Sequence, residues 1–268
     1  MPAPSIVRVT SVPPWASLTD LDVRSYIRRV EAADGQALEP MVRRAIDAFV
    51  RGCKADGIWA AIKASCILAG ARTLTGALVP LAGTAPTNFN FVAGDYNRKT
   101  GLVGNGSTKY LDASFLQNSV GQNNHHMSAW MSSQLSGFAI GSSPAAAVFP
   151  GETLSTGAAT NTFRFRSRYD GLSVDTDFGD RTILGFIGAS RSAGASFTAR
   201  TAGANTTITA NSTAPGANAT HIFRRPNTAS PLYSSSRLAF YSIGESLDLA
   251  LLDARVTTLI NAFAAAIP

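Results

Sequence analysis

The apolar positions of the chain change their period near residue 100. Before that point they recur every three to four residues, as in amphipathic helices, and after it they recur every second residue in short runs. In one such run Phe163 and Phe165 alternate with Arg164 and Arg166. The pattern predicts a mainly β protein, in which a small α-helical N-terminal unit precedes an antiparallel sandwich of about ten strands.

The part before residue 100 divides into three segments. Residues 1–18 are rich in proline and predict an extended arm. Residues 19–72 predict two or three helices, the second with Pro40 in its first turn and the third starting at Ile58. Residues 73–100 are rich in Gly, Pro, Thr and Asn, and they predict a connector with a short edge strand around its two Phe-Asn pairs.

The helical unit predicted at 19–72 is marginal as an independent fold, because about 50 residues bury too little apolar surface. Its apolar stripe is therefore expected to anchor it to the rest of the chain or to a neighbouring subunit. The candidate assembly contacts on this stripe are Ile46, Phe49, Val50 and Trp59.

The sandwich is predicted at 101–268 and includes the end of the chain. The stretch "RLAFYSI" reads as its last strand, and Gly244 separates this strand from a closing helix. Asp248, Asp253 and Arg255 interrupt the helix, which is expected to be too short to cross a membrane. It is predicted instead to cover one end of the sandwich, with four residues packing down: Leu247, Leu251, Leu252 and Val256.

Charge and composition narrow the range of partners. The net charge of +6 on 268 residues is spread evenly along the chain, so no basic patch predicts a nucleic-acid partner. No run of 18 uncharged apolar residues predicts membrane insertion, and no signal-peptide pattern opens the chain. Cys53 and Cys66 have no metal-ligand neighbours and are expected to be buried free thiols.

Three stretches resemble concanavalin-A-like, laminin-G-like sandwich domains. They are "GLVGNGSTKYLD" at 101–112, "MSAWM" at 127–131 and "RLAFYSIGESLDLALLDARV" at 237–256, which resemble the opening, second and closing strands of that family. The resemblance covers about 101–256 and implies a jelly-roll topology.

A second resemblance covers residues 30–112. This segment is similar to a leader region of virion proteins of tailed bacteriophages of aquatic bacteria, where it precedes variable β-sandwiches. The resemblance implies a virion protein that is assembled in the host cytoplasm and contacts other virion proteins of the portal, tail or capsid. A tail fibre or adhesin that binds host surface polysaccharide is expected first and a capsid decoration or head fibre protein second, with a trimer expected by analogy with phage fibres.

Candidate glycan contacts gather around the two adjacent histidines. Neighbouring residues on a strand point to opposite faces, so the two imidazoles cannot hold one metal ion. Aromatic platforms for a sugar are sought at Trp130, Tyr169 and Tyr233, although Trp130 is expected to belong to the core. The candidate contacts are Asn123, Asn124, His125, His126 and Tyr169.

The acidic residues predict no cofactor and no firm metal site. Asp170, Asp175, Asp177 and Asp180 lie within eleven residues, and such oxygen-rich loops suit calcium, but the EF-hand spacing is not met. A solvated turn is the expected state of this loop, with bound calcium as the alternative.

Catalytic residues are not evident in the sequence. Glycoside hydrolysis needs two carboxylates on one face. Glu152 and Glu245 are far apart in the sequence, and neither has a second glutamate near it. Glu245 is instead expected to stabilise the start of the closing helix. The chain is therefore expected not to be an enzyme, and a capsule-degrading glycosidase remains as an alternative.

Overall fold

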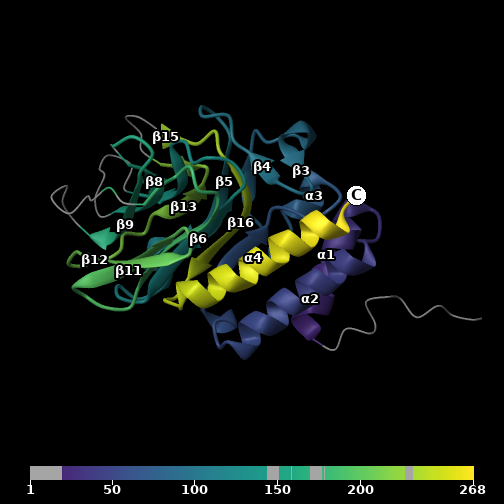
Figure 1. Cartoon of the computed structure of the whole chain (residues 1–268), viewed down its shortest axis with the longest axis horizontal. Helices are drawn as coiled ribbons and strands as arrows, with labels where there is room; N and C mark the ends of the chain where they lie inside the picture. Colours follow the sequence, from purple (N-terminus) through teal and green to yellow (C-terminus); the bar gives the residue numbers. More distant parts are fainter. Residues whose placement is uncertain (1–19, 144–150, 158, 170–176, 178, 227–231) are drawn as a thin grey trace, which may run out of the picture.

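The computed structural model describes residues 20–143, 151–157, 159–169, 177, 179–226 and 232–268. Two antiparallel β-sheets and a layer of helices make three layers, with the helices over the outer face of the larger sheet (Figure 1). The mainly β, antiparallel architecture expected from the sequence is confirmed.

The larger sheet has eight strands in the order β12-β11-β10-β6-β16-β4-β3, and β1 also pairs with β16. Each pair is antiparallel, and β1 and β4 pair with different parts of β16. The strands are β1 (Ile62–Ile67), β3 (Tyr96–Asn97), β4 (Gly101–Val103), β6 (His125–Met131), β10 (Gly185–Arg191), β11 (Ser196–Thr201), β12 (Ala204–Thr209) and β16 (Arg237–Gly244).

The smaller sheet has six strands in the order β2-β5-β13-β7-β8-β9. A separate two-stranded hairpin, β14–β15, follows β13 in the chain. The strands are β2 (Thr87–Phe89), β5 (Tyr110–Leu116), β7 (Phe138–Ser142), β8 (Gly151–Thr156), β9 (Phe163–Tyr169), β13 (Ala219–Ile222), β14 (Arg224–Arg225) and β15 (Leu232–Tyr233). The edge strand predicted in the connector is β2.

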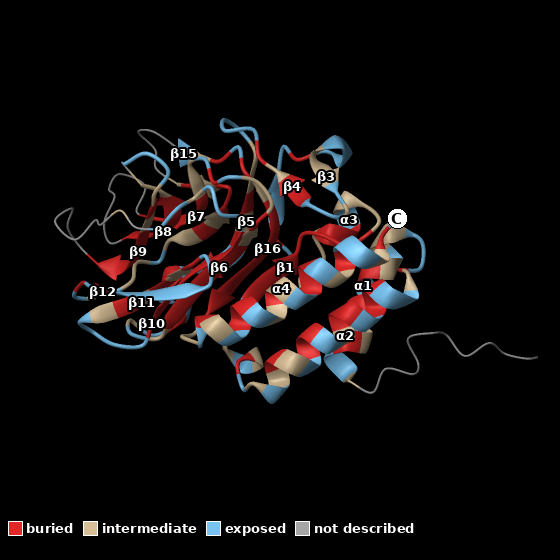
Figure 2. Cartoon of the chain, in the orientation of Figure 1, coloured by how far each residue is buried: buried red, intermediate tan, exposed pale blue. Residues whose placement is uncertain are grey.

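Strand β16 contributes to two hydrophobic cores. Tyr241 and Ile243 belong to the core between the sheets, whereas Ala239 and Phe240 belong to the core between the larger sheet and the helices. The strand is therefore buried along almost its whole length, as its colour in Figure 2 shows. The expectation that "RLAFYSI" is the last strand of the sandwich is confirmed.

Four α-helices are described: α1 (Leu21–Asp34), α2 (Pro40–Ala55), the short α3 (Leu74–Ala77) and α4 (Leu249–Ala266). The Asp20 carboxylate caps α1 by accepting hydrogen bonds from the first-turn amides, and Gly35 ends it in the left-handed conformation. Pro40 opens α2, as predicted. Phe49 of α2 meets Phe240 of β16 edge to face, with ring centres 5.8 Å apart.

The prediction of a third helix from Ile58 was wrong. After one 3₁₀ turn, Ile62–Ile67 forms strand β1, which pairs with β16. Five of its six residues are buried, and a run buried on both faces has no periodicity that separates strand from helix. The segment predicted as a helical unit thus contributes a strand to the larger sheet.

The closing helix differs from its prediction in length and place. It has 18 residues and packs along α2 and the larger sheet, not over one end of the sandwich. Leu252 and Val256 are buried as expected, but Leu251 is 38% exposed. Within the described residues, α4 is the one helix whose length and apolar composition would suffice for a membrane span, a test that core helices also pass.

Candidate functional site

The residues proposed from the sequence as glycan contacts are mostly buried. His125, His126 and Tyr169 are each at most 1% exposed, so they cannot touch a glycan, and this part of the prediction is corrected. Asn123 is exposed and Asn124 is half-buried, and the side-chain oxygen of each accepts a hydrogen bond from a serine of another segment. The five residues do not form one exposed surface.

The adjacent histidines point to opposite faces of β6, as expected. Nδ1 of His126 lies 2.5 Å from the carbonyl oxygen of Glu245, and Nε2 lies 2.8 Å from the hydroxyl of Ser242. Because the carbonyl can only accept, Nδ1 carries the proton and the Ser242 hydroxyl donates to Nε2. Burial lowers the pKa of His126 to about 3, so this imidazole is neutral at pH 7.

His125 points between the sheets to a buried ionic group. Its Nε2 lies 3.2 Å from Oε2 of Glu152, and Arg168 donates from Nε to Oε1 of the same carboxylate over 2.5 Å. Burial raises the pKa of Glu152, but the charges and hydrogen bonds of His125 and Arg168 outweigh it and hold that pKa below its usual range. All three side chains are fully buried, so they link the sheets and do not reach a ligand.

The candidate assembly contacts are also used within the chain. Ile46, Phe49 and Val50 are at most 3% exposed, because they pack in the core under the helices. Trp59 is half-buried, with the ammonium of Lys54 at 5.7 Å from the centre of its ring. The first three residues cannot contact another subunit, and that prediction is corrected.

The aspartate loop is described only in part. Asp170 and Asp175 lie outside the described residues, whereas Asp177 accepts a hydrogen bond from Arg164 and Asp180 accepts two from Thr182. In the described part of the chain, no group of three or more His, Cys, Asp and Glu side chains could hold a metal ion. Glu245, expected at a helix start, pairs with a lysine on β1, and the N-cap of α4 is Asp248.

An aromatic cluster lies on the outer face of the smaller sheet. Pairing of β2 with β5 sets Phe89 opposite Tyr110, and their rings stack in parallel with centres 4.2 Å apart. On β5, Leu111 and Ala113 are buried in the core between the sheets, so Tyr110 and Asp112 project to the other face. Phe89 is 36% exposed and Tyr110 is half-buried, so ring surface remains open to solvent.

The hairpin β14–β15 adds a cation and a second tyrosine. Its register sets Arg224 opposite Tyr233. The guanidinium carbon of Arg224 lies 4.4 Å from the centre of the Tyr110 ring and 5.3 Å from that of Tyr233. The two tyrosine rings meet edge to face, with centres 6.2 Å apart. Such contacts stabilise the guanidinium over the rings.

His221 completes the cluster next to a carboxylate. It faces Asp112 across the β13–β5 pair, with Nε2 3.9 Å from Oδ2, and its ring centre is 5.0 Å from that of Tyr110. Burial, with a contribution from the Arg224 charge, lowers the pKa of His221 to about 4 despite the opposing effect of Asp112. At pH 7 the imidazole is therefore neutral. The aromatic cluster is defined here as Phe89, Tyr110, His221, Arg224 and Tyr233.

Most of this cluster was missed in the sequence. The sequence predicts Tyr233 as an aromatic platform, and it predicts the edge strand that carries Phe89 but no binding role for that ring. The signal that could have found Tyr110 is its alternation with Leu111 in "KYLDAS", which places a ring and a carboxylate together on the solvent face. Trp130, expected in the core, is half-buried and lines a hollow of about 360 Å³ beside α4.

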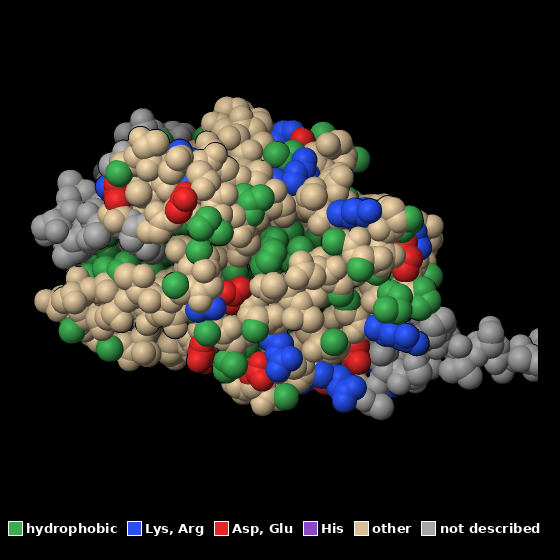
Figure 3. All heavy atoms as spheres, viewed as in Figure 1, with side chains coloured by type: hydrophobic (Ala, Val, Ile, Leu, Met, Phe, Trp, Pro, Cys, Tyr) green, Lys and Arg blue, Asp and Glu red, His purple; other side chains and the backbone are tan. Residues whose placement is uncertain are grey.

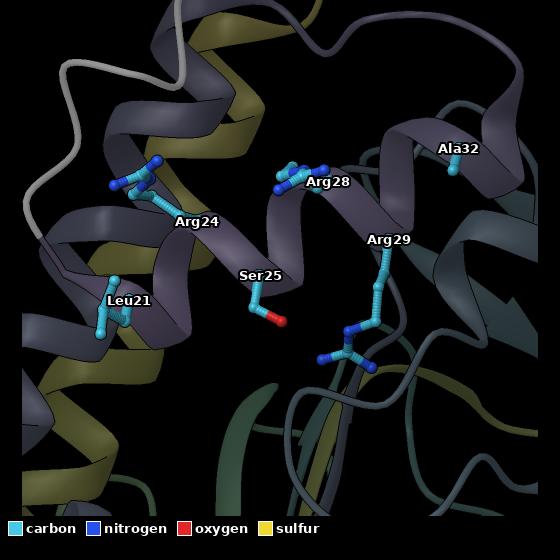
Figure 4. A pocket seen from close by; sticks show the side chains of 6 residues that line it. All are labelled: Leu21, Arg24, Ser25, Arg28, Arg29 and Ala32. Atoms are coloured by element: carbon cyan, nitrogen blue, oxygen red, sulfur yellow. The ribbon is translucent and has the colours of Figure 1, made fainter.

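Two further hollows flank the helices. Of the described residues, those that line one hollow of about 440 Å³ all belong to α1 and include three arginines (Figure 4). Another of about 340 Å³ is lined mainly by polar residues between the start of α4 and strands β10–β12. In the face shown by Figure 3, most Lys, Arg, Asp and Glu side chains lie over the helices. Among the described residues, α1 offers only a single wall, so the first hollow makes a poorer binding site than the aromatic cluster.

No protein-family model matches the chain, and no curated protein matches it. Among solved structures, domain 4 of AbnA, an extracellular arabinanase of Geobacillus stearothermophilus, in complex with arabinotriose, is 16% identical with a TM-score of 0.42 over 65% of this chain and 82% of its own. A mutant of Trypanosoma rangeli sialidase with trans-sialidase activity is 12% identical with a TM-score of 0.47 over 81% of this chain. The same sialidase in complex with 2,3-difluorosialic acid is 13% identical with a TM-score of 0.48 over 89% of this chain.

These matches correct one expectation. The structures come from an arabinanase and from sialidases, which contradicts the prediction that the chain is not an enzyme. That prediction rested on the spacing of glutamates and is withdrawn. The chain spans 39% and 38% of the two sialidase chains, and at these identities and TM-scores the likeness assigns it no activity.

Proposed function

We propose that the chain is a glycan-binding β-sandwich protein of a tailed-phage particle, and that the aromatic cluster is its glycan-binding site. The observation that carries the proposal is the partly exposed Phe89–Tyr110 stack, with Arg224 and Tyr233 beside it. Sugar rings offer apolar C–H faces that pack on aromatic rings, and their hydroxyls need polar partners at the rim. Asp112 and the neutral His221 supply such partners.

The scaffold suits this role. The rings of Phe89 and Tyr110 project from paired strands, which hold binding groups more rigidly than free loops do. The resemblance of "GLVGNGSTKYLD" to a jelly-roll strand includes Tyr110 and Asp112 themselves, and two antiparallel sheets around one core fit that topology. The jelly-roll, concanavalin-A-like assignment is part of the proposal.

The place in a virion rests on the sequence resemblance of residues 30–112. Tail fibre or adhesin is the first position and head decoration the second, with portal, tail or capsid proteins as partners and a trimer as the assembly. Immunogold labelling of whole particles with an antibody to this chain separates the two positions. Label on neither head nor tail contradicts the virion proposal.

Glycan binding is tested with purified protein and a panel of oligosaccharides by isothermal titration calorimetry. Phe89→Ala and Tyr233→Ala are each expected to weaken binding about tenfold, or ~1.4 kcal/mol. Leu251→Ala is the matched control, because Leu251 is as exposed as Phe89 but lies on α4. Equal affinity in the wild type and both aromatic variants, with their folds intact, would exclude the aromatic cluster.

Glycan hydrolysis is a second candidate function, favoured by one observation. Asp112 and His221 place a carboxylate and a neutral imidazole side by side against Tyr110, and both groups can transfer protons. Incubation with capsular polysaccharide should then release reducing ends, and Asp112→Asn should abolish their release. Binding without release would leave glycan binding as the function.

A further inference from the structure

We infer that the glycan bound at the aromatic cluster is acidic and that Arg224 binds its carboxylate. This inference rests on the glycan-binding function proposed above and adds the chemical class of the ligand. It starts from the partners of the Arg224 guanidinium.

Arg224 differs from most other half-buried arginines, because no acceptor for its N–H groups is described, whereas Arg181 and Arg237 donate to backbone carbonyls. Arg98, Arg200 and Arg255 each donate to a carboxylate of this chain within 3.1 Å. Among the described residues, Arg224 forms no ion pair, and its Nε is buried without a hydrogen-bond partner. The Nη groups of this half-buried cation, which are not among the buried unpaired atoms, are the donors that a ligand can satisfy.

Two tyrosine rings limit how those donors are presented. Tyr110 and Tyr233 lie within stacking distance of the guanidinium carbon, at 4.4 and 5.3 Å. The two ring centres are only 6.2 Å apart, so both rings lie toward one side of the guanidinium, and N–H groups on its other side remain able to donate. A carboxylate can accept two parallel hydrogen bonds from such a fork, which an isolated hydroxyl cannot do.

The neighbouring charges determine how the ligand is oriented in the site. The Asp112 carboxylate lies beside His221, at the sheet end of the aromatic cluster, and repels an anion there. Arg224 and Tyr233 lie on the hairpin, whereas Asp112 lies on β5. An acidic sugar would therefore place its carboxylate on the hairpin and its hydroxyls against Asp112.

The inference is tested by calorimetry with matched probes: oligosaccharides of galacturonic, glucuronic and sialic acid, each compared with its methyl ester. The wild type should bind at least one acid about tenfold or more tightly than its ester, since a hydrogen bond to a charged group is stronger than one to a neutral group. Arg224→Gln should bring the ratio to about one, and Arg224→Lys should give an intermediate ratio. Arg200→Gln, on the larger sheet, is the control and should keep the wild-type ratio.

The outcomes separate the inference from the function it rests on. Equal binding of acid and ester by the wild type overturns the acidic ligand and leaves glycan binding intact. A preference for the acid that survives in Arg224→Gln overturns the role of Arg224. No binding of any acid or ester, together with no binding in the neutral panel, overturns both. Circular dichroism of each variant confirms that it is folded.

Discussion

Arg168 donates from Nε to Oε1 of Glu152 over 2.5 Å, and neither side chain is exposed to solvent. Arg168 adopts a positive φ of 54°. This backbone conformation is unfavourable for any residue other than glycine. Its Nη groups form three further hydrogen bonds, to backbone carbonyls of residues 117, 120 and 121. The strained backbone thus places a guanidinium with four hydrogen bonds between the sheets, and removal of its counter-charge should be costly.

Glu152→Gln should lower the free energy of unfolding by about 3–5 kcal/mol, because it leaves the Arg168 charge buried without compensation. Glu245→Gln is the matched control, since the Lys63–Glu245 pair is 39% exposed on both sides and should contribute less than about 1 kcal/mol. Urea unfolding measures both. Similar losses of unfolding free energy in the two variants would show that the buried pair stabilises the fold no more than the exposed pair does.

Lowering the pH below about 6.5 should destabilise the fold because of His126. Its pKa is about 3 in the fold and 6.5 in an unfolded chain, so below pH 6.5 only the unfolded chain takes up the proton. His221, with a pKa of about 4, acts in the same direction. Between pH 6 and 5, His126→Gln should reduce the slope of unfolding free energy against pH by about 1.2 kcal/mol per unit. An unchanged slope would mean that His126 is protonated in the fold.

Phe49→Ala should cost about 3–5 kcal/mol, because the ring is 2% exposed and meets Phe240 in the core under the helices. Met41→Ala, on the same helix but 55% exposed, should stay within about 0.5 kcal/mol of the wild type. Thermal unfolding compares them. If Phe49→Ala were as stable as Met41→Ala, the helices would not be part of the folded core.

The two thiols should be inert in the native protein. Cys53 and Cys66 are free and buried, and burial raises the pKa of each to about 12. A thiol reagent such as Ellman's reagent should therefore react with neither until denaturant is added, when it should titrate both. Rapid reaction of one thiol before unfolding would show that its segment opens locally.

The sequence was sufficient for elements whose pattern is local. Asp20, Pro40 and Gly35 mark helix ends by chemistry that acts within one turn, and "RLAFYSI" followed by Gly244 marks a strand end. Strand β1 could not be recognised, because its partner β16 lies far along the chain and both of its faces are buried. The position of α4 could not be predicted either, because α4 packs on the larger sheet that includes this distant strand pair.

The candidate site could not be assembled from the sequence for a similar reason. Its five residues come from β2, β5, β13, β14 and β15, which meet only through strand pairing and the hairpin. The histidine pair, which stood out by rarity, is used inside the protein, where His125 meets Glu152 and His126 meets Ser242. A rare residue pair indicates a structural or functional constraint. The sequence alone does not tell whether that constraint is a buried hydrogen bond or a binding surface.

The most direct test of the glycan-binding claim is a map of the bound sugar on the protein. Backbone ¹H–¹⁵N spectra recorded during titration with the best-binding oligosaccharide report which amides sense the ligand. We expect the shifts to concentrate on β2, the start of β5, β13 and the hairpin β14–β15, around Tyr110 and Arg224. Shifts confined to the polar hollow between α4 and β10–β12, or no shifts at saturating ligand, would contradict the account.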